Sequence, residues 1–313
     1  MCTSLTRQTL DHHFLAGRTM DFPIKGNWHP VLVAAKTYNT PLAGNRPIKY
    51  PFIGGGQLID NRYLLVADGV NNQGLSCAEL MFPLKASYHP TPVDHKLNLT
   101  PQDFLSWVLA EHRSVADVLT DLNQVAIIGH EWLSGHEVYA FHWLLTDSSG
   151  QTVIIEPLNQ QLVVITDNIG VLTNSPVYVD HIQNLKHQLH VTTDKFSEWQ
   201  RASKQLVVNH AVPRPTNTPT TRFVYTAVNK LGTTPSDNPK TAVNFLNQLL
   251  SDVAISFEPA MNQHPNFNFT HYISSWDCTA LTYQFTDCEN KKAMTFSLTD
   301  ALNNSSQSTH FLV

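Results

Sequence analysis

The sequence predicts an α+β fold in which helices cover largely antiparallel sheets. Three observations lead to this prediction. Short apolar segments bounded by Gly, Asn, Asp and Pro fill the first 85 residues and return near the end of the chain. Helical patterns occupy the stretches between these two blocks. Neither an internal repeat nor a long linker divides the 313 residues, so we expect one domain that spans residues 2–313.

The strand-like segments of the first block lie at residues 2–5, 14–20, 31–35, 63–67 and 75–81. Each is short and apolar, and turn-forming residues separate one from the next. The run Gly54-Gly55-Gly56 lacks the Lys and Ser/Thr that complete a phosphate-binding loop. We therefore interpret this run as a turn between strands.

Two helices are expected next, and both have clear start signals. Thr100 and Asp103 form a capping box around Pro101 at the first helical position, and Ser114 and Asp117 repeat the cap. Further strands are expected at residues 142–146, 152–156, 162–166 and 171–173, further helices at 180–187, 222–231 and 240–250, and strands again over 270–297. The proline-bearing stretch 205–221 is interpreted as a loop.

The composition argues against several classes of protein. The net charge is −5 with only 20 Lys and Arg residues, so we expect no nucleic-acid partner. No apolar run approaches the roughly 20 residues that span a bilayer, so we expect no membrane partner. The start of the chain lacks the apolar region of a signal peptide, and four cysteines are too few for a disulfide framework. We expect a cytoplasmic protein, and the sequence leaves open whether Cys278 and Cys288 are paired.

We predict a site without metal or cofactor. His130 and His136 lie in a segment that superficially resembles a zinc-protease motif, but they are six residues apart. Two ligands on one helix face need a spacing of four. The G-x-S-x-G motif of serine hydrolases does not occur either.

The most informative feature is Cys2, which directly follows the initiator Met. Removal of Met1 would leave Cys2 with a free α-amine, and such amines titrate at about 7.7–8.0, close to working pH. The amine can take the proton of the adjacent thiol and later protonate the leaving amine. One residue then supplies both nucleophile and base. Many proteins begin with Met-Cys by chance, so other residues must support this interpretation.

Three further features support a reaction centre at Cys2. Arg18 and Asp21 lie on opposite faces of a regular strand, near its end, where Arg18 would favour the thiolate and Asp21 would hold the amine. Asn174 ends a strand with an amide suited to donate to a developing oxyanion. Arg222 opens a helix beside the proline-rich loop. Taken singly, these features also describe a surface ion pair, an ordinary turn and a solvated cation.

Seven segments occur along the chain in a characteristic order. They are MCTSLT at residues 1–6, AGRTMDF at 16–22, VADGVN at 66–71, GLSCA at 74–78, HWL at 142–144, GVLTNSP at 170–176 and TRFV at 221–224. Together they resemble the choloylglycine hydrolase family, which comprises bile salt hydrolases and penicillin V acylases. The resemblance spans residue 2 to at least residue 229.

The resemblance implies a four-layer αββα fold of the N-terminal-nucleophile type and hydrolysis of a linear amide bond through an acyl-thioester on Cys2. Carried over by position, Cys2 is nucleophile and base, while Arg18 and Asp21 orient and tune it. Asn174 is an oxyanion donor and Arg222 supports the site. The resemblance also implies a homo-oligomer, which is a tetramer in relatives.

Two departures from the family pattern bear on the substrate and the assembly. Met81 stands where bile salt hydrolases usually have Asn and penicillin V acylases have Tyr, and its side chain donates no hydrogen bond. Residues 212–219 replace a Gly-rich stretch that relatives use in tetramer assembly and at the pocket rim. Residues 74–82 and 173–176 are closer to penicillin V acylases. The sequence therefore favours a penicillin V acylase-like activity, with a conjugated bile salt hydrolase that releases glycine or taurine as the alternative.

Candidate substrate-binding residues are apolar side chains near the motif ends, namely Met20, Phe22, Met81, Phe82, Tyr139 and Phe141. A pocket of this kind suits phenoxyacetyl, fatty acyl and steroid acyl groups alike, and N-acyl homoserine lactones are a further candidate. A catalytically inactive binding module is the remote alternative. It predicts the loss of at least one of the five catalytic residues, and all five are present, namely Cys2, Arg18, Asp21, Asn174 and Arg222.

Overall fold

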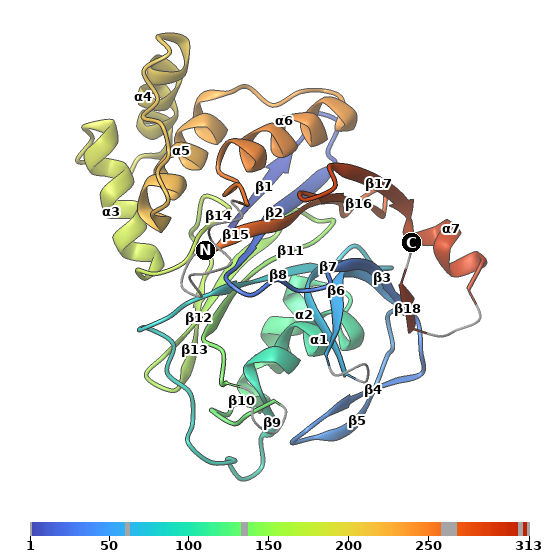
Figure 1. Ribbon diagram of the computed structural model, residues 1–313. Coiled ribbons are helices and arrows are strands. Elements are labelled where there is room, and N and C mark those ends of the chain that lie inside the picture. Colours follow the sequence, from blue (N-terminus) through green and yellow to red (C-terminus); the bar gives the residue numbers. More distant parts are fainter. Residues whose placement is uncertain (1, 60–62, 133–136, 258–267, 306–308, 312–313) are drawn as a thin grey trace.

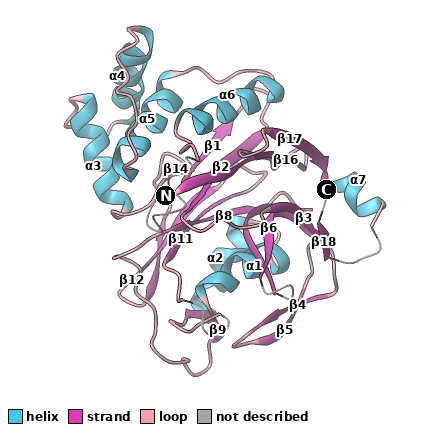
Figure 2. Ribbon diagram, in the orientation of Figure 1, coloured by secondary structure: helices cyan, strands magenta, loops and turns pink. Residues whose placement is uncertain are grey.

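Two antiparallel sheets form the centre of the molecule, and helices cover the outer face of each (Figure 1, Figure 2). The structure is a computed structural model that describes residues 2–59, 63–132, 137–257, 268–305 and 309–311. Its layers follow the order helix, sheet, sheet, helix. The predicted α+β fold of the N-terminal-nucleophile type is therefore confirmed.

The first sheet contains the N-terminal strand next to its edge strand. Its strand order is β14 (Val171–Leu172), β1 (Thr3–Gln8), β2 (Phe14–Phe22), β15 (Phe269–Asp277), β16 (Thr282–Asp287) and β17 (Lys292–Ser297). Helices α5 (Pro219–Gly232) and α6 (Pro239–Asp252) cover its outer face, and α3 (Tyr178–Leu189) and α4 (Phe196–Val208) pack beside α5 (Figure 1).

The second sheet is the larger of the two. Its order is β13 (Gln161–Ile165), β12 (Thr152–Leu158), β11 (Phe141–Thr146), β8 (Ser76–Met81), β7 (Tyr63–Asn71), β6 (Phe52–Ile59), β3 (His29–Val33) and β18 (Thr309–Phe311). Helices α1 (Pro101–Glu111) and α2 (Val115–Asp121) cover its outer face. Two small ribbons, β4 (Thr37–Thr40) with β5 (Gly44–Pro47) and β9 (Leu97–Leu99) with β10 (Val125–Ile127), the short 3-10 helix η1 (Leu122–Gln124) and helix α7 (Leu298–Asn303) complete the described elements.

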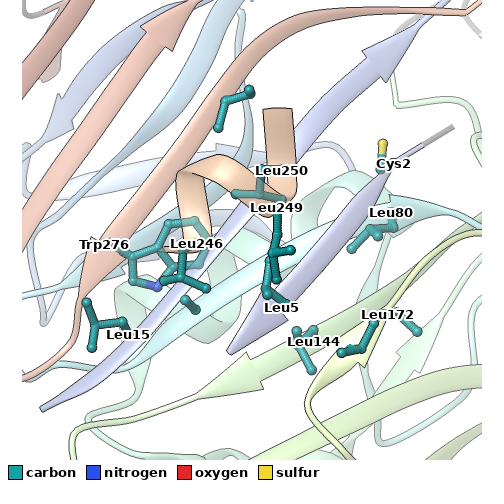
Figure 3. Close-up of a cluster of buried hydrophobic side chains, with 14 of the residues drawn as sticks. Cys2, Leu5, Leu15, Leu80, Leu144, Leu172, Leu246, Leu249, Leu250 and Trp276 are labelled. Carbon is teal, nitrogen blue, oxygen red and sulfur yellow. The ribbon is translucent and has the colours of Figure 1, made fainter. Parts of the chain in front are cut away.

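The main core joins the helical layer of the first sheet to the space between the sheets. Leu5 of β1 is fully buried beside Leu249 and Leu250 of α6, whereas Leu80 of β8 comes from the second sheet. Figure 3 shows this cluster with Cys2 at its margin. The apolar packing therefore fixes the start of the chain between the two sheets.

Helix starts follow the cap signals, with one correction. The capping box at Thr100 and the cap at Ser114 are confirmed. The loop predicted over 205–221 is wrong at both ends, because α4 continues to Val208 and α5 begins at Pro219. Thr218 caps α5 by accepting from the Thr221 N–H, and Pro219 occupies a first-turn position, where a missing N–H costs nothing.

The predicted turn at Gly54-Gly55-Gly56 is also wrong, since these residues lie inside β6. The structure gives the reason for the glycines. A Cβ at Gly54 would collide with the Asp68 carbonyl, and one at Gly55 would collide with the Tyr272 hydroxyl. Glycine here permits a close approach within and between sheets rather than a change of direction.

Several other expectations concern the whole chain. The four cysteines, all within the described residues, are unpaired, so Cys278 and Cys288 are not joined. Across the part of the chain that the structure describes, no helix is long and apolar enough to cross a bilayer. The single domain over 2–313 and the homo-oligomer remain predictions, and Met1 and His136 lie outside the described residues.

Candidate active site

The register of β1 on β2 determines which side chains meet at the chain terminus. Ser4 pairs with Arg18 and Thr3 with Thr19, so these two pairs point to opposite faces of the sheet. Cys2 shares the face of Ser4 and Arg18, which is turned toward the second sheet. Its exposed fraction is 2%. The terminal cysteine thus points into the space between the sheets.

Arg18 lies directly against the Cys2 sulfur. Its Nη2 donates to Cys2 Sγ at 3.0 Å, and Sγ also lies 3.6 Å from the Asp21 backbone oxygen. Burial lowers the pKa of Arg18, but the nearby Cys2, Tyr272 and Asp68, which can carry negative charge, raise the pKa by more, so it stays above its ordinary value. A permanent cation beside the thiol favours the thiolate, which is the nucleophilic form.

The second sheet holds Arg18 in this position. Pairing of β7 with β8 ends at Asp68 and Ala78, and beyond this pair the strands part. Arg18 Nη1 enters the gap and donates to the Ala67 and Glu79 backbone oxygens at 2.7 Å each. The guanidinium therefore completes the hydrogen bonding of two diverging strands while it contacts the sulfur.

Asn174 holds the nitrogen of Cys2. Its Oδ1 accepts from Cys2 N at 2.5 Å and from Arg222 Nη2 at 3.1 Å, and its Nδ2 donates to the Met81 backbone oxygen at 2.7 Å. Two donors face the oxygen and one acceptor faces the nitrogen, so the contacts fix the orientation of the amide. The Nδ2 group carries two N–H bonds, and this contact with Met81 uses one of them.

Two buried histidines position the backbone around Asn174. His181 Nε2 donates to the Asn174 carbonyl at 2.8 Å, and His142 Nε2 lies 2.7 Å from the Thr173 carbonyl. Burial lowers the pKa of His181 to about 4. His181 is therefore a neutral ring at working pH, and its proton resides on Nε2.

Arg222 and Asp21 form a buried ion pair on the helix side of the sheet. Arg222 Nη1 donates to Asp21 Oδ2 at 2.9 Å, and Thr270 Oγ1 donates to Asp21 Oδ1 at 2.7 Å. Both charged side chains are almost fully buried. Because Arg222 also bonds to Asn174, the ion pair and the Cys2 nitrogen belong to one network. The structure thus brings all five predicted catalytic residues together.

A mostly apolar pocket opens from Cys2. Its empty volume is about 610 Å³ when its open mouth is counted, but the cavity that admits a water-sized sphere is only about 60 Å³. Five predicted substrate-binding residues line it, namely Met20, Phe22, Met81, Tyr139 and Phe141. Flexible Met side chains in the wall can change rotamer to admit a larger group.

Phe82 is the exception among the predicted pocket residues. It is absent from the lining, because consecutive strand side chains point to opposite faces and Phe82 follows Met81. It is fully buried, and its ring stacks on His142 with centroids 4.2 Å apart. Phe82 therefore supports His142, the β11 histidine that contacts the Thr173 carbonyl beside Asn174, instead of lining the pocket.

Sequence reasoning missed other residues that line the pocket, among them Trp28, Gln57, Leu65, Glu79, Gln102 and Trp132. For two of them the sequence contained a signal. Glu79 interrupts an otherwise apolar strand, and Gln102 follows Pro101 on the first turn of a buried helix. A polar residue in such a position needs a partner, and a ligand is one kind of partner.

The comparisons with known proteins agree with this geometry. Residues 2–310 match the linear amide C–N hydrolases of the choloylglycine hydrolase family. The chain belongs to this family. Within the described residues, no group of three or more His, Cys, Asp or Glu side chains is placed to hold a metal ion.

Several curated relatives of this chain are bile salt hydrolases. A bile salt hydrolase/transferase of Clostridium perfringens is 29% identical, over 93% of this chain and 91% of its own length. A conjugated bile acid hydrolase of Lactobacillus gasseri is 26% identical, over 97% and 98%. These relatives support the bile salt alternative better than the penicillin V preference drawn from the motifs.

Solved structures share the fold over nearly the whole chain. A mutant conjugated bile acid hydrolase from Clostridium perfringens superposes with a TM-score of 0.82 and 24% identity, covering 100% of this chain and 97% of that one. Penicillin V acylase from Agrobacterium tumefaciens gives a TM-score of 0.76 and 17% identity, covering 98% and 88%. Both activities therefore occur on this fold.

Proposed function

We propose that the protein hydrolyses the amide bond of a conjugated bile acid or a similar N-acyl amide, with Cys2 as the nucleophile. The contacts of Cys2 carry this proposal. Its sulfur is held by the Arg18 cation and its nitrogen by the Asn174 amide oxygen, at the inner end of an apolar pocket. An acyl group in the pocket brings its carbonyl carbon to the sulfur. The bile salt hydrolases among the relatives favour this substrate class.

The first half of the reaction forms a thioester. With Met1 removed, the Cys2 amine takes the thiol proton, and the thiolate attacks the amide carbonyl carbon. The carbonyl oxygen becomes an oxyanion, to which Asn174 Nδ2 can donate. The C–N bond then breaks as the amine of Cys2 returns the proton to the leaving nitrogen. The products are the acyl-thioester and the free amine.

The second half releases the acid. Water enters as the amine leaves, the Cys2 amine takes a proton from it, and the resulting hydroxide attacks the thioester carbonyl. The C–S bond breaks and the sulfur leaves as a thiolate that Arg18 stabilises. The protonated amine returns its proton to the sulfur, the acid departs, and the enzyme regains its starting state. No further cofactor is needed to balance the atoms or the charge.

Penicillin V is the second candidate substrate. The narrow cavity and the apolar Met81 in its wall favour a slender aromatic acyl group such as phenoxyacetyl. A steroid acyl group needs the wall to open further. The two substrates can be separated in one experiment.

Purified protein whose mass shows that Met1 is absent is incubated with glycocholate and with penicillin V, and the released primary amine is quantified. We expect release from glycocholate, and loss of release in Cys2→Ala. Cys278→Ala is the matched control, since this buried cysteine lies away from the pocket and should retain turnover. If amine is released from penicillin V alone, penicillin V replaces the conjugated bile acid as the proposed substrate. Undiminished turnover by Cys2→Ala would exclude the mechanism.

A further inference from the structure

The pocket contains buried polar groups that the reaction does not use. Glu79 and Gln102 line the pocket, and each has an exposed fraction of only 3%. Glu79 Oε2 and both amide atoms of Gln102 have no hydrogen-bond partner within the described residues. A buried polar atom left without a partner costs about 1–3 kcal/mol. These two side chains, together with Trp28, whose buried indole nitrogen also lacks a partner in the wall of the same pocket, require an explanation.

Their positions in the fold place them between the second sheet and α1. Glu79 shares its face of β8 with Cys77 and Met81, and both of these pack against the apolar cluster under α1. Gln102 lies in the first turn of α1. The helix cap does not engage it, because Asp103 makes the cap contacts with Thr100.

The backbone and the side chain of Glu79 make different contacts. Its carbonyl oxygen accepts from Arg18 Nη1 at 2.7 Å, which links it to the reaction centre. Burial raises the pKa of its carboxyl well above the ordinary value, and the nearby Arg18 cation and the Trp143 indole N–H on the neighbouring strand oppose this only in part. A neutral carboxyl offers both a donor and an acceptor, as does the Gln102 amide.

We propose that Glu79 and Gln102 recognise a hydroxyl group on the acyl part of the substrate. A hydroxyl both donates and accepts, so one group can satisfy a side chain of each kind. An anionic substituent would have to lose its hydration in an apolar wall, and a cationic one would approach the Arg18 guanidinium. This inference rests on the proposed function for the position of the reacting amide. The inference adds that the acyl group of the substrate carries a hydroxyl.

Matched substrates that differ by one hydroxyl test the proposal. The first pair is the glycine conjugates of 5β-cholanic acid and of its 3α-hydroxy derivative, lithocholic acid. The second pair is penicillin V and its para-hydroxy derivative. For at least one pair we expect kcat/KM to be about tenfold or more higher for the hydroxylated member, since a site built to bond a hydroxyl rejects the analogue that lacks it.

Variants assign the preference to the two side chains. Glu79→Leu and Gln102→Leu should each reduce the preference to about twofold or less, whereas Glu79→Gln should retain part of it. Gln205→Leu is the matched control, because Gln205 is exposed on α4 away from the pocket. Equal rates within both pairs in the wild-type protein would overturn the proposal. A preference that survives in both Leu variants would overturn it as well.

Binding separates this inference from the proposed function. Calorimetry with Cys2→Ala measures the affinity for the four free acids that the amides would release, and it needs no turnover. Tighter binding of a hydroxylated acid, lost in the Glu79→Leu background, supports the inference even if no amide is hydrolysed. Hydrolysis without any preference in rate or affinity would leave the enzyme assignment intact and refute the role of Glu79 and Gln102.

Discussion

The two ends of the pocket differ in how their polar groups are satisfied. At the reaction centre, Arg18 and Asn174 each bond to several fixed partners. In the wall, Glu79 Oε2 and the Gln102 amide have no partner within the described part of the chain. We call the reaction-centre end complete because each of these catalytic side chains already has fixed protein partners, which hold it in place before substrate arrives. Polar groups that lack partners until substrate binds, such as those of Glu79 and Gln102, are arranged to recognise the substrate.

Breaking the complete end should give the largest loss of stability. Arg222→Met removes one partner of a fully buried ion pair and leaves the Asp21 carboxylate without its cation. We expect the free energy of unfolding to fall by about 3–5 kcal/mol, measured by urea denaturation. The double variant with Asp21→Asn should recover part of this loss, because it removes the stranded charge. A loss below about 1 kcal/mol would mean that the pair contributes little to the network.

Lowering the pH should also reduce the free energy of unfolding through the reaction-centre end, by a somewhat smaller amount. Burial lowers the pKa of His181 from 6.5 to about 4 in the folded state. Between these pH values the unfolded chain binds a proton that the folded protein does not, so stability falls as the pH falls. The contribution of His181 amounts to about 3 kcal/mol over this window.

His181→Gln is the variant that isolates this effect. Gln keeps an N–H donor for the Asn174 carbonyl and does not titrate. We expect the difference in unfolding free energy between wild type and variant to change steadily between pH 6.5 and pH 4. A pH-independent difference would show that His181 does not stay neutral in the folded protein.

A substitution in the pocket wall, the incomplete end, should instead increase the free energy of unfolding. Glu79→Leu replaces a buried carboxyl, whose Oε2 has no hydrogen-bond partner in the described part of the chain, with an apolar group of similar size. We expect the free energy of unfolding to rise by about 1–2 kcal/mol while recognition of hydroxylated substrates is lost. Thermal or urea denaturation of the free protein measures the effect. A decrease in stability would indicate that Glu79 has a structural partner and would weaken the contrast between the two ends.

The sequence predicted the complete end better than the incomplete one. Arg18, Asn174 and Arg222 belong to motifs with a chemical reason for each residue type, and the structure brings them to Cys2. Glu79 belongs to a strand whose residues from Cys77 to Met81 are otherwise apolar, and strand patterns identify the faces of a strand, not what lies across from them. Its relation to Gln102 depends on how α1 packs on β8, which is tertiary information.

Similar reasons explain where the prediction of the fold from the sequence was wrong. The Thr100 and Ser114 caps are local signals and were predicted, and the equivalent Thr218-Pro219 signal was masked by neighbouring prolines. The glycines of β6 were mistaken for a turn because their purpose is to admit Tyr272 and Asp68 from elsewhere in the fold. Local chemistry predicts where elements begin, and long-range contacts decide exceptions of this kind.

The burial of Cys2 has a practical consequence for producing the protein. Its nitrogen bonds to Asn174 Oδ1 in the interior, and β1 runs between two neighbouring strands directly after it. An affinity tag fused before Cys2 would have to leave through this space, and it would turn the amine into an amide. Under the proposed mechanism, a tag belongs after β18, an edge strand of the second sheet, where it leaves the Cys2 amine free.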